Sequence, residues 1–192
     1  EGIKPTEHIL NRYSEINLSQ WKLVELGKLT REEVLVRRYE ILFQEVGMSC
    51  DAKKISEKYE DFLGEGHYFI SGAKELLEDL SKKYHLYLAS NGAVKVQMSR
   101  IQSAGIEKYL EKIFLSEQIG YEKPSPQFFE KCFAQIPDFK KEEALILGDS
   151  LTSDIRGGKN AGILTVWFHP SGKKVEEEIV PDYEIGKLEE LK

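Results

Sequence analysis

The stretch ALILGDSLTSD, residues 144–154, begins as a short apolar run and ends in glycine, carboxylate and hydroxyl side chains. An uninterrupted apolar run of this length is typical of a strand that is buried on both faces of a parallel sheet. Similar runs occupy residues 86–89, 113–115 and 164–168. Amphipathic helical spacing occupies residues 73–84, 94–104, 126–134 and 153–161. The alternation predicts an α/β fold in which helices cover both faces of a parallel sheet.

The first third of the chain shows helical spacing and no convincing strand. A first amphipathic helix is predicted to stop at Gly27, since glycine favours helix ends. Thr30 and Glu33 form the signature of a capping box and predict the start of a second helix. A third helix precedes Gly64-Glu65-Gly66, which we interpret as a linker. The sequence therefore predicts a helical domain over residues 1–66 and an α/β domain over residues 67–192.

The composition limits the kinds of partner that the chain could bind. It carries 27 Lys plus Arg and 33 Asp plus Glu in 192 residues, a formal net charge of −6. This balance gives no bulk attraction for nucleic acid or an anionic membrane. No stretch approaches the ~20 apolar residues of a membrane-spanning helix, and residues 1–5 lack the apolar core of a signal peptide. Cys50 and Cys132 cannot build a disulfide framework, so we predict a reducing, cytoplasmic location.

Polar side chains follow three of the predicted strands. Ser90 and Asn91 come directly after the first strand, Lys123 lies in the loop beyond the second, and Asp149 follows the third. In sheets of this kind ligands bind beyond the carboxyl ends of the strands. We therefore expect these side chains to lie along one rim of the sheet.

The Ser90-Asn91-Gly92 turn has groups that suit phosphate oxygens. A hydroxyl group and the backbone N–H groups of a glycine-containing turn can donate hydrogen bonds to an anion. The alternative is an ordinary turn, because Asn-Gly is common turn chemistry. Lys123 stands before Pro124, which fixes the local path of the chain, and its ammonium group could neutralise an anion. A solvent-facing surface lysine is the alternative there.

Asp149 and Asp154 are two carboxylates five residues apart, one at a strand end and one at the start of a predicted helix. A carboxylate directly after a buried run is costly to leave unpaired, so Asp149 is expected to face a cation or several donors. Mg²⁺ takes oxygen ligands and usually keeps several waters, and the pair could hold it. Alternatively, Asp154 simply stabilises the helix N-terminus, while Ser150 or Thr152 caps it.

Three motifs in this order resemble those of the haloacid dehalogenase superfamily: LASNG at 88–92, GYEKPSPQFF at 120–129, and LGDS at 147–150 continuing through Asp154 to Gly162. The resemblance covers roughly residues 70–170. It implies a Rossmann-like core with a parallel sheet, to which residues 1–66 add a small all-helical cap. Within that cap, Asn17, Trp21 and their neighbours resemble the pyrimidine 5′-nucleotidase subgroup. That closer resemblance implies that Asn17 and Trp21 contact a nucleobase, although packing is the simpler role for them.

The sequence departs from the family pattern in one respect. The first family motif is a strand that ends in Asp-x-Asp, and no Asp-x-Asp occurs in the 192 residues. In the family this strand precedes the cap and lies in the middle of the sheet. Its loss would leave backbone groups of two buried strand edges unpaired. We therefore expect the sequence to be an incomplete record, with an N-terminally incomplete cap and a core without its first strand. The alternative is an inactive relative whose sheet has closed up.

The resemblance implies phosphomonoester hydrolysis through an aspartyl-phosphate, with the nucleophile and acid/base aspartates outside the given chain. Ser90, Asn91, Gly92 and Lys123 would then bind the phosphoryl group, with Ser90 and Lys123 acting in catalysis, and Asp149 and Asp154 would hold Mg²⁺. The expected substrate is a nucleoside 5′-monophosphate or a similar small phosphorylated metabolite, and the expected state is a monomer or homodimer. Alternatives are a metal-independent haloacid dehalogenase, a sugar-phosphate mutase, and a catalytically inactive phosphate-binding or scaffold protein.

Overall fold

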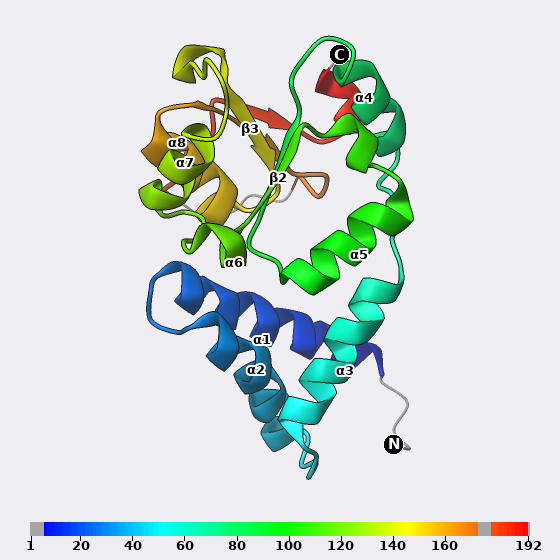
Figure 1. Ribbon diagram of the computed structural model, residues 1–192. Helices are drawn as coiled ribbons and strands as arrows, with labels where there is room; N and C mark the ends of the chain where they lie inside the picture. Colours follow the sequence, from blue (N-terminus) through cyan, green and yellow to red (C-terminus); the bar gives the residue numbers. More distant parts are fainter. Residues whose placement is uncertain (1–5, 173–177, 192) are drawn as a thin grey trace. The chain divides into compact units, whose positions relative to one another are not determined.

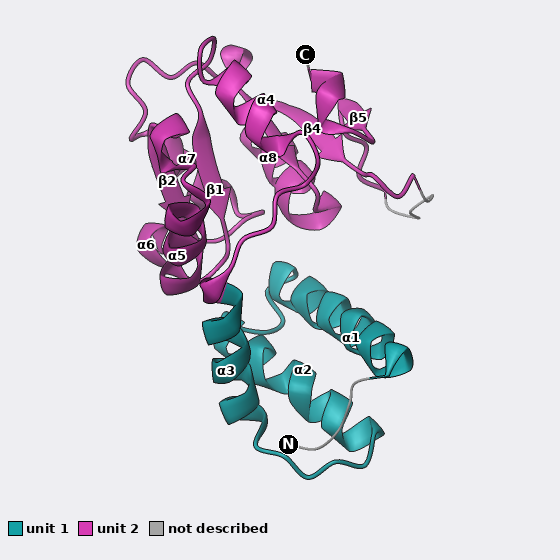
Figure 2. Cartoon of the chain, turned by 90° about the vertical axis from the view of Figure 1, so that its right-hand side faces the viewer, with its two compact units in different colours: residues 1–63 teal, residues 64–192 magenta. Residues whose placement is uncertain are grey.

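The chain divides into two compact units, Glu1–Leu63 and Gly64–Lys192 (Figure 2). The computed structural model describes residues 6–172 and 178–191. The opening residues 1–5, considered above for a signal peptide, lie outside the described part. Among the described residues, no helix combines the length and the apolar character needed to cross a membrane.

Unit 1 consists of three helices (Figure 1). They are α1 (Glu7–Glu25), α2 (Arg31–Glu45) and α3 (Ala52–Glu65). The predicted capping box is confirmed, because Glu33 N donates to Thr30 Oγ1 at 3.2 Å and Thr30 N donates to Glu33 Oε2 at 2.7 Å. The predicted linker is wrong for two of its residues, since α3 continues through Gly64 and Glu65. A single glycine costs a helix only about 1 kcal/mol, which need not end it.

The interior of unit 1 combines an aliphatic core with a buried cation. Ile16, Val24, Val34 and Leu42 are buried where α1 packs against α2. Arg38 is 4% exposed, and its guanidinium lies 5.1 Å from the ring centre of Tyr39 and 5.3 Å from that of Tyr59. Cation–π contacts of this kind gain strength away from water. They account for a buried arginine in a helical unit.

The described residues of unit 2 form two separate parallel sheets. The strands are β1 (Tyr87–Ser90), β2 (Lys112–Leu115), β3 (Leu145–Gly148), β4 (Leu164–Phe168) and β5 (Tyr183–Ile185). β1 pairs with β2, whereas the second sheet has the order β3-β4-β5, and every pairing is parallel. The predicted parallel arrangement is confirmed, and β5 is a strand that the sequence pattern did not reveal. Ser90, expected in a turn, is the last residue of β1.

Strands β1 and β3 do not pair with each other in the described part of the chain. The alternative of a sheet closed up between these strands is therefore wrong for the described residues. Each of the two strands is hydrogen-bonded to one neighbouring strand, β1 to β2 and β3 to β4. The ends of β1 and β3 are connected instead through side chains, as described below.

The helices of unit 2 alternate with the strands along the chain (Figure 1). They are α4 (Ala73–Leu80), α5 (Val94–Ala104), α6 (Ser116–Ile119), α7 (Pro126–Phe133) and α8 (Arg156–Ala161). The helix predicted over 73–84 ends at Leu80, and Tyr84, expected inside, is exposed because the chain leaves the helix before it. The helix predicted from Ser153 begins at Arg156 and follows a π-helical turn over Leu151–Ile155.

Two apolar clusters hold unit 2 together. One consists of Phe114, Phe128, Phe129, Cys132, Ala161 and Ile163, and the other of Leu76, Val166, Phe168, Ile185 and Leu188. Gly157 faces the first cluster, and a Cβ atom at this position would lie 2.6 Å from the Phe129 ring. The close approach of α8 to α7 therefore requires glycine here. This packing positions the turn that carries Asp154.

Candidate phosphate and metal site

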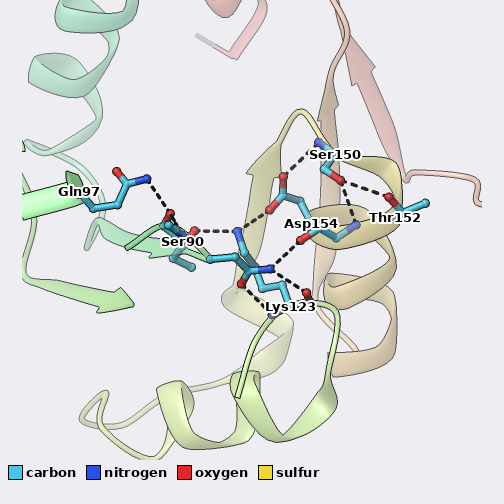
Figure 3. A network of polar contacts seen from close by, with 10 residues as sticks. Ser90, Gln97, Lys123, Ser150, Thr152 and Asp154 are labelled. Atoms are coloured by element: carbon cyan, nitrogen blue, oxygen red, sulfur yellow. Dashed lines mark hydrogen bonds and ion pairs between the residues drawn. The ribbon is translucent and has the colours of Figure 1, made fainter. Parts of the chain in front are cut away.

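Lys123 connects the end of β1 to the turn after β3 (Figure 3). Its Nζ donates to the carbonyl oxygen of Ala89 at 2.7 Å and to Asp154 Oδ1 at 2.6 Å. Lys123 is 7% exposed, so the surface-lysine alternative is wrong. An ammonium group has three N–H donors, and two of them are used within the described residues. The third has no acceptor among the described residues.

Asn91 fixes the loop that carries Lys123. Its Oδ1 accepts from Lys123 N at 2.9 Å, and its Nδ2 donates to the Lys123 carbonyl oxygen at 2.8 Å. Nδ2 also approaches Ser153 Oγ at 3.5 Å. Both polar atoms of the Asn91 side chain are therefore bonded within the protein. Only the backbone groups of Asn91 can contact a ligand.

Ser90 is prepared to donate a hydrogen bond. Its Oγ accepts from Gly92 N and from Gln97 Nε2, each at 3.0 Å. A hydroxyl group has two acceptor positions and one donor, so these bonds leave the O–H free to donate within the described residues. The Gly92 N–H donates to Ser90, and the predicted contact of Gly92 with phosphate stays a prediction. Gln97, on the first turn of α5 and seven positions after Ser90, was not predicted from the sequence.

Asp154 is buried, with 7% of its surface exposed, and both of its oxygens have partners. Oδ1 accepts from Lys123, and Oδ2 accepts from Ser150 N at 3.1 Å. Ser150 Oγ caps the turn by accepting from Ser153 N at 3.1 Å, which confirms a capping role for Ser150. A Cβ atom on Gly148 would lie 2.3 Å from the Asp154 carboxyl group. Position 148 therefore requires glycine for the Asp154 carboxylate to lie where it does.

Asp149 has the opposite environment. Its side chain is exposed, and it forms no hydrogen bond or ion pair with any residue that the structure describes. The expectation of a buried Asp149 that requires a partner is therefore wrong, and the buried carboxylate is Asp154, which has the Lys123 cation beside it. Strand β3 ends at Gly148, so Asp149 is the first residue beyond the strand, and it is exposed. Asp149 therefore offers a carboxylate without a partner among the described residues, five positions before Asp154.

The two residues proposed to contact a base lie in unit 1, on α1. Asn17 Oδ1 accepts from Arg38 Nη1 at 2.8 Å, and Trp21 is half-buried. The Asn17 carbonyl oxygen is thus engaged inside the helical unit.

Comparison with known proteins gives the family. The family model described as haloacid dehalogenase-like hydrolase matches residues 2–168. The chain belongs to this family. The putative HAD-hydrolase YfnB of Bacillus subtilis is 41% identical over 191 residues, covering 100% of this chain and 81% of YfnB. The pyrimidine 5′-nucleotidase PynA of Streptococcus pneumoniae is 35% identical over 192 residues, covering 100% of this chain and 81% of PynA.

Solved structures of this hydrolase family have the same fold. Magnesium-bound YfnB from Bacillus subtilis matches with a TM-score of 0.93 at 41% identity, over 98% of this chain and 83% of that chain. A 2-haloacid dehalogenase from Pseudomonas syringae pv. tomato matches with a TM-score of 0.63 at 23% identity, over 99% of this chain and 80% of that chain. The first comparison confirms the mixed α/β architecture with parallel sheets, and the second concerns the fold alone.

The side chains of this hydrolase family member are compatible with a magnesium ion in one respect and incomplete in another. Mg²⁺ is commonly bound through one or two carboxylates together with water and phosphate oxygens, and the unengaged Asp149 carboxylate suits that use. Within residues 6–172 and 178–191, no group of three or more His, Cys, Asp or Glu side chains could hold a metal by itself. A bound magnesium ion would therefore depend on oxygens from a substrate, from water or from a further carboxylate.

Proposed function

We propose that this protein is a magnesium-dependent phosphomonoester hydrolase that acts on small phosphorylated metabolites, with nucleoside 5′-monophosphates as the favoured class. The observation that carries the proposal is the arrangement around Lys123. The buried Lys123 ammonium donates to the Ala89 carbonyl oxygen near the end of β1 and has one N–H unused among the described residues. Ser90, the last residue of β1, has a hydroxyl group whose two acceptor positions are already filled. Two such donors are suited to a tetrahedral anion.

Each residue has a distinct task in this proposal. The Ser90 O–H donates to one phosphoryl oxygen, and the Lys123 ammonium neutralises charge that develops on the group during transfer. Asp154 forms an ion pair with Lys123 and holds its side chain in place, while Asn91 fixes the Lys123 backbone. Asp149 would hold Mg²⁺, which supplies further charge neutralisation at the phosphoryl oxygens when it is bound.

The nucleophile is assigned from family resemblance alone. In haloacid dehalogenase-like hydrolases an aspartate of the Asp-x-Asp motif attacks phosphorus and displaces the ester oxygen of the substrate, which the second aspartate protonates. Water activated by the same second aspartate then hydrolyses the aspartyl-phosphate and releases phosphate. No Asp-x-Asp occurs in residues 1–192. We therefore assign to these residues the binding of phosphate and metal, and we propose that turnover requires the Asp-x-Asp carboxylates as well.

The substrate class is inferred from the relatives. PynA from Streptococcus pneumoniae and YjjG from Escherichia coli, 26% identical over 179 residues, are pyrimidine 5′-nucleotidases. We propose that the helical unit acts as the cap that selects the leaving group, with Trp21 and Asn17 as base contacts. The cytoplasmic location and the monomeric or homodimeric state stay predictions.

Binding and turnover test the proposal separately. Residues 1–192 should bind inorganic phosphate and Mg²⁺ in calorimetric titrations, and Ser90→Ala should weaken phosphate binding while Mg²⁺ binding is retained. Ser99→Ala is a matched control, because Ser99 lies on α5 and its Oγ donates to the Gly64 carbonyl oxygen instead. A variant of Ser90 that binds phosphate as tightly as the parent would contradict the assignment.

Turnover is measured on a form extended at its N-terminus by a strand that carries Asp-x-Asp. This form should release p-nitrophenol from p-nitrophenyl phosphate with Mg²⁺ and lose that activity in EDTA. A panel of pyrimidine nucleoside monophosphates and sugar phosphates then tests the substrate class, and equal rates on both would leave a general phosphatase. Metal-independent release of chloride from a 2-chloro acid would identify a dehalogenase, and binding without any turnover would identify an inactive relative.

A further inference from the structure

The peptide bond between Asp149 and Ser150 is held at both of its polar atoms. The carbonyl oxygen of Asp149 accepts from Trp167 Nε1 at 3.0 Å, and the N–H of Ser150 donates to Asp154 Oδ2 at 3.1 Å. These two groups belong to one planar unit, so the two bonds together fix its orientation. The Asp149 side chain leaves the backbone directly beside this peptide.

Trp167 is well placed for this contact. It lies on β4 in register with Gly148 of the neighbouring β3, so the next residue of that chain segment is within reach of the indole. Trp167 is 9% exposed, and a buried indole N–H is normally satisfied by an acceptor. Its only acceptor in the described part of the chain is a main-chain atom of the loop that carries Asp149.

The indole ring is in turn supported from the end of β4. The ring of His169 stacks on it with centres 3.9 Å apart and planes 18° apart. His169 Nδ1 lies 3.1 Å from Glu184 Oε1 on β5, and Ser171 Oγ lies 2.7 Å from His169 Nε2. Contacts at both nitrogens restrict rotation of the imidazole, and the stacked pair therefore has a defined place.

The fixed Asp149–Ser150 peptide matters because no hydrogen bond among the described residues orients the Asp149 side chain. Its carboxylate has no partner among the described residues, so its direction depends on the backbone from which it extends. If the backbone beside the Asp149 carboxylate were mobile, binding a cation would cost conformational entropy. Because the Asp149–Ser150 peptide is already fixed in the folded protein, that part of the cost does not arise on binding.

We propose that Trp167 is a positioning residue for magnesium, which fixes the Asp149–Ser150 peptide and so directs the Asp149 carboxylate. The inference rests on the proposed function, because it takes Asp149 as the metal ligand. It assigns to Trp167 a role that acts through a main-chain carbonyl oxygen and involves no contact with the metal or the phosphate. Asp154 completes the arrangement from the other side by joining the same peptide to Lys123.

Trp167→Phe tests this role in residues 1–192, because it retains a buried aromatic ring beside His169 and removes the N–H. Loss of a partner that orients a metal ligand typically costs about tenfold or more in metal affinity. Calorimetry should show this loss for Mg²⁺ and an unchanged affinity for inorganic phosphate. Phe168→Leu is the matched control on the same strand, because Phe168 is buried in the second apolar cluster and should lower stability without altering Mg²⁺ affinity.

A second measurement needs no variant. The chain has two tryptophans, Trp21 and Trp167, and so two indole N–H signals in a proton–nitrogen spectrum. Titration with Mg²⁺ should shift the Trp167 signal with the same midpoint as calorimetry and leave the Trp21 signal unchanged. An unmoved Trp167 signal, or Trp167→Phe with the parent's Mg²⁺ affinity, would overturn the inference while the proposed function stood. If the parent protein and Asp149→Asn bound Mg²⁺ equally, the magnesium assignment itself would fail.

Discussion

Lys123 Nζ lies 2.6 Å from Asp154 Oδ1, and the two side chains are 8% and 9% exposed. The residues are 31 positions apart in the chain and belong to the loop before α7 and the turn after β3. Two opposite charges at this distance attract far more strongly in the protein interior than in water. The ion pair also reaches β1, because Lys123 donates to Ala89 as well. It therefore connects strands of two sheets that are not paired with each other within residues 6–172 and 178–191.

Removing one charge of this pair should be costly. Lys123→Met leaves Asp154 buried without its cation, and loss of one partner of a buried pair typically costs about 3–5 kcal/mol. Urea unfolding measures the cost. Lys108→Met serves as the surface control. The double variant Lys123→Met/Asp154→Leu should recover part of the stability, and a double variant that loses the sum of both single costs would argue against the pairing.

Asp149→Asn should separate metal binding from stability. The side chain is exposed and unengaged among the described residues, so the free energy of unfolding should change by less than about 0.5 kcal/mol. Mg²⁺ affinity should fall by at least about tenfold, because the amide carries no charge. Asp138→Asn, at another exposed aspartate, is the control. Calorimetry that gives both variants the same Mg²⁺ affinity would remove Asp149 from the metal site.

Asp182 should make the protein sensitive to acid. The Lys159 ammonium, 2.6 Å away, and the hydroxyl and amide of Thr165 lower the pKa of Asp182 to about 2. A carboxylate whose pKa is depressed in the folded state stabilises the protein above its unfolded pKa of about 3.9. That contribution is lost as the pH falls from about 4 to about 2. Asp182→Asn should therefore be less stable than the parent at neutral pH, and the difference should shrink towards pH 2. A constant difference across this range would contradict the linkage.

The two cysteines should react with thiol reagents at different rates. Burial raises the pKa of the Cys132 thiol to about 12, although Lys123 opposes the shift. Only the thiolate is a nucleophile, so Cys132 should stay unreactive at pH 8 until the protein unfolds. Cys50 is only partly buried and should react first. In Cys50→Ser the remaining thiol should react at a rate that rises with urea, and rapid labelling of it in native buffer would contradict the burial.

Local pattern predicted much of the secondary structure because neighbouring residues determine it. The bounds of α5 and β4 were predicted to the residue, and the capping box at Thr30 and Glu33 is formed. The errors arose where distant parts of the chain intervene. β5 is three residues long and pairs with β4, which lies well before it in the chain, so no local periodicity indicates it. The π-helical turn before α8 forms where the Asp154 carboxylate accepts hydrogen bonds from Ser150 N and Lys123 Nζ. The spacing of apolar residues in the sequence cannot reveal these contacts.

The sequence by itself determined the alternation of strands and helices, the helical character of the first unit, and the hydroxyl, ammonium and carboxylate groups that follow the strands. Apolar spacing and residue chemistry are local properties, and they can be read from the chain. Only the tertiary structure decided which carboxylate is buried against Lys123 and which is exposed, and that Asn91 holds a loop while Ser90 keeps its O–H. It alone brought Trp167 to the Asp149 carbonyl oxygen, because burial and hydrogen-bond partners depend on which distant segments pack together.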